Sequence, residues 1–518
     1  MRVVKSLLLG TAAGLIAVGG AQAADLPVKA KAVEYVKICS LYGAGFYYIP
    51  GTDTCIKLGG YLRAEVALNA GGNYSASYNN VFAANNRLTN TYSMRAREDL
   101  NIDTRTATEY GVVRTYFDAV FTWTTGNYVG TGSGTGSTQY SGTLGLNSAG
   151  TGLVGSSGGA VNATDGGISG GSLGVYYAFI QFAGFTMGKA VSQFDAPWIN
   201  YPGNNFDQLV GGSGSTNGVA QFTYTADFGQ GITAAISAQD QTQVYQTAIW
   251  NTAGMSTTGV LGGAYGSNDL GGSSSPDIVG MVRVDQAWGL FQASVAAHDN
   301  HVGYYGATEA TGHPGDKWGW AAQLALSIKN IPTGAGDVIN VSGVYTEGAS
   351  RYNFQELAAT SYSMFGSSSS AYQSIGFAGV SDAVFGPGGQ LELTKTYGFR
   401  GAYTHNWNPN WNTALYGAWA AVNYSGTAKS LICSSASFAT LTGTCNPDFN
   451  IGQLGVITRW TPVKGLTFSA DFVYSHLDQK YSGTITPAAL TSVAKPATTY
   501  ELKDQDTYTL LLRAQRNW

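Results

Sequence analysis

Short segments that alternate apolar with polar residues recur along this whole chain, and they constrain its fold more than any other feature. In residues 317–329, for example, Trp318, Trp320 and Leu324 alternate with Lys317 and Gln323. Successive side chains of a β-strand point to opposite faces, so each segment is predicted to be a strand with one apolar and one polar face. Sixteen such strands are predicted, near residues 57–68, 91–104, 108–123, 173–182, 184–191, 218–228, 231–240, 278–285, 288–298, 317–329, 337–347, 393–406, 411–423, 449–461, 465–477 and 506–518.

The connections between these strands alternate between short turns and long segments. Short turns are predicted at residues 105–107, 229–230, 286–287, 407–410 and 462–464. Long segments rich in Gly, Ser, Thr and Asn are predicted at residues 69–90, 124–172, 192–217, 241–277, 299–316, 348–392, 424–448 and 478–505. An even strand number, with short turns at one end and long loops at the other, is typical of an outer-membrane barrel. The glycine-rich tracts could instead link soluble domains, but their repeated place between paired strands favours surface loops.

The composition agrees with strands that face lipid. Charged residues make up only 11% of the chain, against about a quarter in ordinary globular proteins. No run of 18 uninterrupted apolar residues follows the N-terminal region, so no helical membrane span is predicted. We therefore expect an all-β fold, a 16-stranded antiparallel transmembrane β-barrel with short periplasmic turns and long external loops. A closed barrel pairs every backbone group, and at this size its polar interior fills with water.

The N-terminal end has the three parts of a secretory signal. Arg2 and Lys5 are basic, residues 7–18 form a short apolar run, and "AQA" at the end of the signal supplies the small residues of a cleavage site. Cleavage is therefore predicted between Ala23 and Ala24. The predicted parts of the chain are the signal at 1–23, a periplasmic N-terminal segment at 24–56 and the barrel at 57–518. The chain has 27 Lys and Arg against 31 Asp and Glu, which argues against a nucleic-acid partner.

Four cysteines fit an exported protein. They allow three pairings, and the local pairs Cys39–Cys55 and Cys433–Cys445 close the shortest loops. An oxidising compartment would keep such pairs as disulfides, one in the periplasmic segment and one in an external loop. The alternative is a metal site, but no C-x-x-C spacing supports it.

Several stretches resemble one family. They are "KSLLLGTAAGLIA", "EYVKICSLYGAGFYYIPGTDTCIKLGGYLRAE", "YAFIQFAGFTMGKAVSQF" and the closing "LLRAQRNW". The sequence is similar to the alphaproteobacterial general porins, the trimeric porins of rhizobia and their relatives. The resemblance implies a homotrimer in the outer membrane of a Gram-negative cell, which crosses it many times and lets ions and small hydrophilic solutes diffuse through. It also implies that insertion machinery reads the last strand, with Tyr508 and Trp518 at its two ends, although the usual terminal residue is Phe.

In this family the third long loop folds back into the lumen and narrows it, which implies the same for residues 192–217. That loop carries Asp195 and Asp207, and strand parity predicts inward-facing arginines at Arg63, Arg95, Arg97 and Arg114. Opposite charges on wall and loop would set a transverse field across the constriction. Other lumen-lining residues predicted by parity are Glu65, Asp118, Arg400, Arg459 and Arg513. Alternatively, the arginines pair with nearby carboxylates such as Asp99 or Asp103 and hold the wall rigid.

The apolar face of nearly every strand argues against a soluble all-β adhesin or propeller. The sequence leaves two other functions open. A substrate-selective channel, for sugars or anions, would need aromatic residues through the lumen, and only Tyr61 and Tyr116 face inward by parity. An outer-membrane enzyme would need a catalytic or metal site, for which "AHDNH", with His298, Asp299 and His301, is the best candidate. We expect these three residues to be solvated at a strand–loop junction, and we expect no catalysis, no metal and no cofactor.

Overall fold

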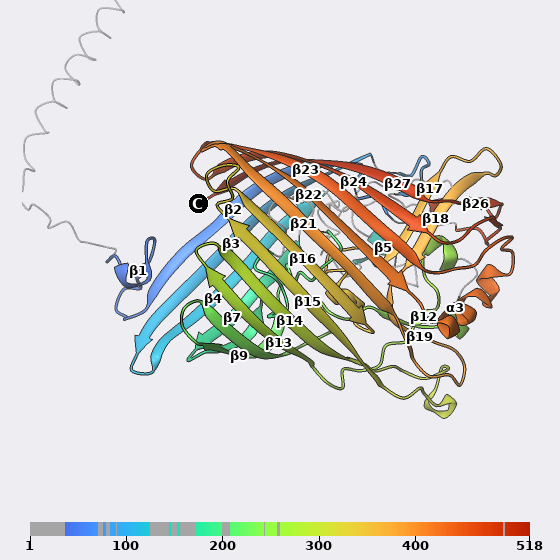
Figure 1. Ribbon diagram of the computed structural model, residues 1–518, viewed down its shortest axis with the longest axis horizontal. Coiled ribbons are helices and arrows are strands. Elements are labelled where there is room, and N and C mark those ends of the chain that lie inside the picture. Colours follow the sequence, from blue (N-terminus) through green and yellow to red (C-terminus); the bar gives the residue numbers. More distant parts are fainter. Residues whose placement is uncertain are drawn as a thin grey trace, which may run out of the picture.

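A ring of antiparallel strands forms the body of the molecule. The computed structural model describes residues 37–70, 76–78, 83–89, 91–124, 144–146, 153–155, 172–198, 208–242, 244–255, 259–490 and 493–518. The ring strands are β2 (Cys55–Leu68), β3 (Tyr92–Thr108), β4 (Gly111–Thr124), β7 (Ser172–Phe182), β8 (Phe185–Ala190), β9 (Val219–Asp227), β10 (Ile232–Gln239), β13 (Asp277–Gln286), β14 (Gly289–Asn300), β15 (Lys317–Lys329), β16 (Val338–Glu347), β21 (Lys395–Asn408), β22 (Trp411–Asn423), β23 (Phe449–Val463), β24 (Leu466–Gln479) and β27 (Gln505–Asn517). Each corresponds to one of the sixteen strands predicted from the sequence (Figure 1).

Pairing between the first and last ring strands closes the barrel. Each strand pairs antiparallel with its neighbour in sequence order, and β2 then pairs with β27 from Tyr61 opposite Asn517 to Leu68 opposite Leu510. No helix among the described residues is long and apolar enough to cross a membrane. The predicted fold class is confirmed, because closure leaves no strand edge in the hydrocarbon.

The two faces of the ring separate apolar from polar residues as the alternation predicted. Leu62, Phe222 and Leu324 are each more than half exposed on the outer face. On the inner face Thr223 and Gln292 are fully buried. Apolar side chains face lipid and polar side chains face the interior, which is the arrangement of an outer-membrane barrel.

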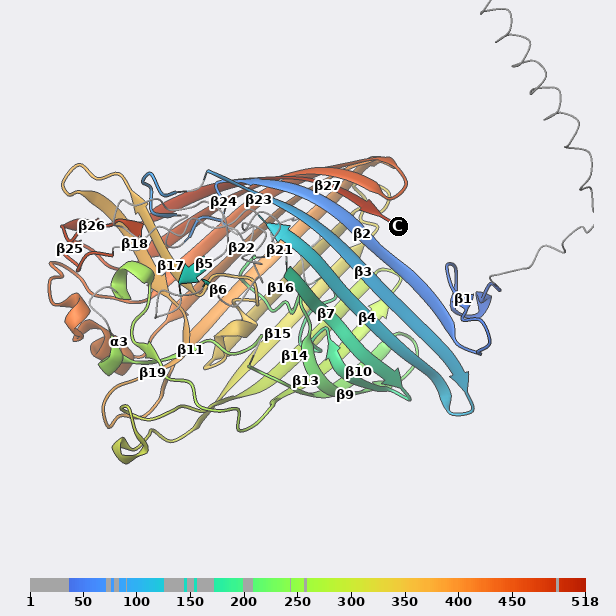
Figure 2. The same ribbon diagram turned by 180° about the vertical axis from the view of Figure 1, so that it is seen from behind.

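One predicted turn lies in the wrong place. Residues 105–107 were expected to connect two strands, but β3 continues to Thr108, which is opposite Gly111 in β4. The turn is therefore Glu109–Tyr110, and these two strands form the long hairpin that projects from the short-turn end (Figure 2). The backbone pairing between the two strands continues through polar residues here, with Asp103 opposite Tyr116 and Thr104 opposite Thr115.

The long loops have secondary structure of their own. Their strands are β5 (Leu144–Leu146), β6 (Leu153–Gly155), β11 (Ala248–Asn251), β12 (Ser267–Asn268), β17 (Ser361–Gly366), β18 (Gln373–Gly379), β19 (Ser381–Phe385), β20 (Glu392–Leu393), β25 (Thr484–Ile485) and β26 (Tyr500–Leu502). Helix α3 (Gly426–Cys433) and the short 3-10 turns η3 (Thr252–Gly254), η4 (Gly259–Gly262), η5 (Glu309–Thr311), η6 (Ser350–Tyr352) and η7 (Ala436–Phe438) join them.

Together, β11, β12, β17–β20, β25, β26 and α3 form what we call the external cap. Two four-stranded sheets, β17–β18–β26–β25 and β12–β11–β19–β20, make up most of it. Phe354, Phe377, Phe438 and Tyr500 belong to one buried apolar cluster, although they come from three different loops. The cap lies at the end of the barrel opposite the C-terminus (Figure 1).

Both predicted disulfides are present. Cys433–Cys445 joins the end of α3 to the chain before β23, within the external cap. Cys39–Cys55 lies at the short-turn end, where η1 (Ser40–Tyr42) and β1 (Tyr47–Tyr48) precede β2 (Figure 2). The predicted signal, with Ala23 and Ala24, lies outside the described residues.

Candidate pore constriction

The third long loop, between β8 and β9, folds into the barrel as expected. Its described residues reach strands on the far side of the ring, where wall side chains hold the loop backbone. Gln292 of β14 donates to the Asp195 carbonyl at 2.9 Å, and Gln323 of β15 donates to the Phe194 carbonyl at 2.9 Å. Arg400 of β21 donates to the Ser213 carbonyl at 2.5 Å. The loop therefore crosses the interior and fills the part of the lumen next to β14–β23.

Glycines allow the loop to lie directly on the wall. Gly211 has a φ of +85°, and a Cβ there would be 2.2 Å from the Phe399 carbonyl oxygen. At Gly212 a Cβ would be 2.9 Å from Nε of Arg400. Arg400 faces inward, as parity predicted, but the loop covers it and leaves it 1% exposed. It holds the loop in place and does not present its charge to open water.

Asp195 differs from its expected role. Its side chain is 1% exposed, and its carboxylate accepts hydrogen bonds from the Ser215 amide at 2.7 Å, the Ser215 hydroxyl at 2.5 Å, the Tyr245 hydroxyl at 3.0 Å and the Ser213 hydroxyl. Burial raises the pKa of Asp195 above its ordinary value, against the opposing effect of these donors. The expectation of a lumen-facing acid is therefore wrong for Asp195, because the loop turns the carboxylate inward on itself. Asp207 lies outside the described residues.

The opposite wall, formed by β27, β2, β3, β4 and β7, carries the predicted arginines. Glu65 lies between two of them, paired with Arg95 and with Arg513 at 2.5 Å. These three residues are opposite one another in the strand register. The Arg95 side chain is only 7% exposed, so it and Glu65 form a buried ion pair within the wall.

Arg63, Arg97 and Arg114 are half-buried on the same wall. Nε of Arg63 donates to Gln515 at 2.8 Å, and Nε of Arg97 donates to Thr122 at 3.0 Å. Arg114 pairs with Asp103 at 3.0 Å, and its side chain is 28% exposed. The alternative that the arginines stiffen the wall is thus partly correct, with Glu65 and Asp103 as the carboxylates.

The remaining predicted lining residues also face inward. Asp118 is buried on β4 and accepts from the Tyr116 hydroxyl at 3.4 Å. Arg459 of β23 faces inward on the part of the wall that the third loop covers, which we call the covered side of the lumen. Tyr416 lies next to Arg459 and donates to Asp471 at 2.6 Å. Parity predicted the direction of these side chains, but it gave no information about which of them the loop covers.

Sequence reasoning missed two groups of residues. Gln292, Gln323 and Gln453 hold the loop, and glutamines repeated on the polar faces of strands were the available signal. Tyr177 and Phe179 also face inward, because the register between β4 and β7 shifts at Asp118 and Ala119. That irregularity reverses the parity of β7 partway along, so simple alternation could not place its aromatic residues.

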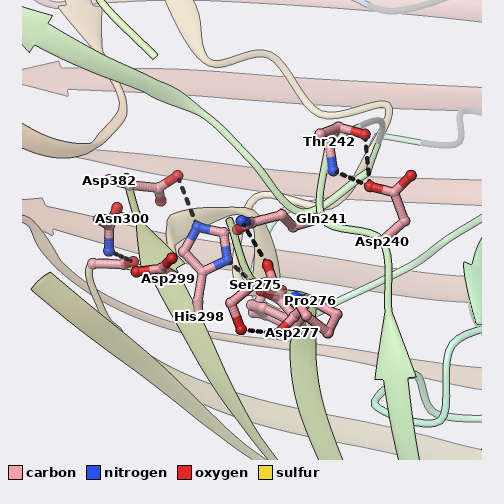
Figure 3. A network of polar contacts seen from close by, with 12 residues as sticks. Asp240, Gln241, Thr242, Ser275, Pro276, Asp277, His298, Asp299, Asn300 and Asp382 are labelled. Carbon is pink, nitrogen blue, oxygen red and sulfur yellow. Dashed lines mark hydrogen bonds and ion pairs between the residues drawn. The ribbon is translucent and has the colours of Figure 1, made fainter. Parts of the chain in front are cut away.

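The "AHDNH" segment was expected to be solvated, and this is wrong for His298 and Asp299, which are buried, whereas His301 is partly exposed next to Asp316. His298 is fully buried, with Nδ1 2.8 Å from Asp277 and Nε2 3.7 Å from Asp382 (Figure 3). Asp382 belongs to the external cap, and it also accepts from the Ser350 amide at 2.6 Å. The segment ties the barrel wall to the folded-in loops. Within the described part of the chain, no group of three or more His, Cys, Asp or Glu side chains could hold a metal ion.

A closed membrane barrel with a polar interior and an infolded loop defines an outer-membrane channel. The comparisons with known proteins agree. The family described as "Porin subfamily" matches residues 25–511, so the chain belongs to this family. It is a general diffusion channel of the outer membrane, which it crosses many times.

Among similar proteins, porin Omp2a of Brucella melitensis is 32% identical over 304 residues, which cover 58% of this chain and 67% of that one. Porin Omp2b of Brucella suis biovar 1 is 32% identical over 307 residues, with the same shares. The outer membrane channel DcaP of Acinetobacter baumannii has a similar fold, with a TM-score of 0.54 at 14% identity over 91% of this chain and 99% of that one.

Proposed function

We propose that the channel is narrowest between the third loop and the arginine-bearing wall, and that this constriction favours anions. The observation that carries the proposal is an imbalance of charge. Among the described residues of β27, β2, β3, β4 and β7, inward arginines outnumber inward carboxylates. The arginines are Arg63, Arg95, Arg97, Arg105, Arg114 and Arg513, and the carboxylates are Glu65, Asp99, Asp103 and Asp118.

The loop does not balance this excess through Asp195, because that carboxylate is buried away from the wall. A lumen with positive charge on one side raises the local concentration of anions and lowers that of cations. Ions and small hydrophilic solutes then pass by diffusion, with no covalent step, no metal and no cofactor. The predicted transverse field therefore lacks the Asp195 carboxylate on the loop side. Its remaining source is the positively charged wall, whose half-buried charges are Arg63, Arg97 and Arg114.

We also propose a homotrimer, supported by two charges on the outer face. Leu62 points outward, and it is opposite Glu98 on one side and Arg516 on the other. Residues directly opposite in an antiparallel pair share a face, so Glu98 and Arg516 also point outward. A charge is costly on a lipid-facing wall, and contact with a neighbouring subunit would remove that cost. Glu98→Leu should therefore change the temperature at which trimers dissociate in detergent.

Export and insertion complete the proposal. Residues 1–23 would be cleaved between Ala23 and Ala24, and insertion machinery would read the strand that ends with Trp518. Tyr508, on the outer face of β27, and Trp518, which directly follows this strand, are both more than half exposed, which suits interfacial aromatic residues. Mass spectrometry of the mature N-terminus tests the cleavage site.

The reversal potential in a planar bilayer under a salt gradient tests the proposed selectivity. The wild-type channel should give a sign that corresponds to anion preference, and Arg97→Gln together with Arg114→Gln should reduce it. Lys329→Gln makes the same kind of charge change at an exposed site at the short-turn end of β15, so it should leave the potential unchanged. A cation-selective wild-type channel would contradict the proposal.

A further inference from the structure

The arginine wall also carries a series of aromatic rings, and the rings lie against the arginines. The Arg63 guanidinium lies 4.3 Å from the ring centre of Tyr61. That of Arg97 lies 5.7 Å from the ring of Tyr176. These pairs are on β2, β3 and β7, which are consecutive or nearly consecutive strands of the wall opposite the third loop.

A third arginine lies next to two rings. Arg114 is 5.1 Å from the ring centre of Tyr116 and 5.5 Å from that of Phe179. Tyr116 and Phe179 themselves stack, with ring centres 5.4 Å apart and planes at 29°. Tyr177 extends this cluster, with its ring centre 6.4 Å from Tyr116. Each of these side chains is half-buried, so part of each faces the lumen.

We propose that this wall is a binding track for aromatic carboxylates, which rests on the anion-favouring constriction proposed above. A carboxylate can accept from a guanidinium while its attached ring stacks on a neighbouring aromatic face. The repeated pairs Arg63–Tyr61, Arg97–Tyr176 and Arg114–Tyr116 offer this combination on four strands, β2, β3, β4 and β7. A solute could therefore move from one pair to the next, as multi-site conduction requires.

The covered side of the lumen differs, because the ring beside Arg459 there, Tyr416, is buried and donates to Asp471. Its inward residues Gln292, Gln323, Arg400 and Gln453 contact the third loop. The outer-face rings Phe185 and Phe222, 5.8 Å apart, point to lipid. Aromatic residues next to arginines thus lie where a solute would pass, and this arrangement goes beyond what an anion-favouring pore needs.

The test uses two monocarboxylates of similar size, benzoate and cyclohexanecarboxylate, of which only benzoate has an aromatic face. Each is added to single wild-type channels in a planar bilayer, and the concentration that halves the chloride current is measured. Benzoate should act at a concentration about fivefold lower, the effect of one stacking contact of about 1 kcal/mol. Equal concentrations would overturn the proposal.

Variants separate the rings from the charges. Tyr116→Leu combined with Phe179→Leu should remove most of the preference for benzoate while leaving the reversal potential unchanged. Phe185→Leu combined with Phe222→Leu removes the outer-face pair and should leave both values unchanged. Heat-modifiable electrophoretic mobility establishes that each variant is folded.

Three further results test parts of this proposal and separate it from the selectivity on which it rests. Neutral benzyl alcohol should block far less than benzoate, and equal block would overturn the role of the arginines. A reversal potential without anion preference, measured before any solute is added, would refute the proposed selectivity separately. A preference for benzoate that survives the loss of Tyr116 and Phe179 would overturn the assignment to these rings.

Discussion

Replacing Asp195 with alanine should loosen the third loop and change the pore. The Asp195 carboxylate accepts four hydrogen bonds from Ser213, Ser215 and Tyr245, all within the barrel interior. A hydrogen bond to a charged group contributes about 1.5–3 kcal/mol, but the buried carboxylate also loses several kcal/mol of hydration. The net loss in Asp195→Ala should therefore be about 2–4 kcal/mol, a change of about 30- to 1000-fold in the population of displaced loop.

Single-channel recording measures this effect. Asp195→Ala should show larger or more frequent conductance fluctuations than the wild type, while the barrel strands remain folded. Asp240→Ala is the matched control, because the exposed Asp240 carboxylate accepts from Thr242, two residues away, and from no other residue among those the structure describes (Figure 3). Conductance and noise in Asp195→Ala that match those of Asp240→Ala would refute the anchoring role of this carboxylate.

Three further changes test other parts of the structure. Gly455→Ala would place a Cβ 2.1 Å from Cζ of buried Tyr416 and should cost at least about 1–3 kcal/mol. The yield of folded barrel should fall, whereas Gly280→Ala, whose Cβ would meet only Val295 at 3.4 Å, should leave it unchanged. Replacing Cys433 and Cys445 with serine opens a loop with a sequence separation of 12 and should cost the external cap about 3 kcal/mol, seen as faster proteolysis of the cap with an intact barrel. Burial lowers the pKa of Lys495, in the loop before β26, to about 8, so the stability it contributes is present at high pH and is lost as pH falls through about 8. Proteolysis of the cap should therefore slow as pH rises from about 7 to about 10, and Lys495→Met should flatten this dependence.

The strands could be predicted because each one separates lipid from water. A period of two residues places Leu62 outside and Arg63 inside with no knowledge of any neighbour. The contacts of Glu65 could also be predicted from the sequence, since closure of the barrel brings β27 next to β2. That closure puts Arg513 opposite Glu65 on one side and Arg95 opposite it on the other.

The interior of the site could not be predicted in the same way. Burial of Asp195 depends on Ser213, Ser215 and Tyr245, and that of His298 depends on Asp382. These contacts join residues far apart in the chain through irregular loops, where no periodic pattern determines the direction in which a side chain points. The external cap has the same difficulty, because Phe354, Phe438 and Tyr500 meet in one core only once three loops have folded together.

The central claim is that an open, water-filled passage runs between the third loop and the arginine wall. Single-channel conductance of the purified, refolded protein in a planar bilayer tests it most directly. Ohmic conductance steps with a reversal potential of the anion-selective sign are the predicted result. Correctly folded barrels that conduct no current would contradict the claim, because the loops would then close the lumen completely.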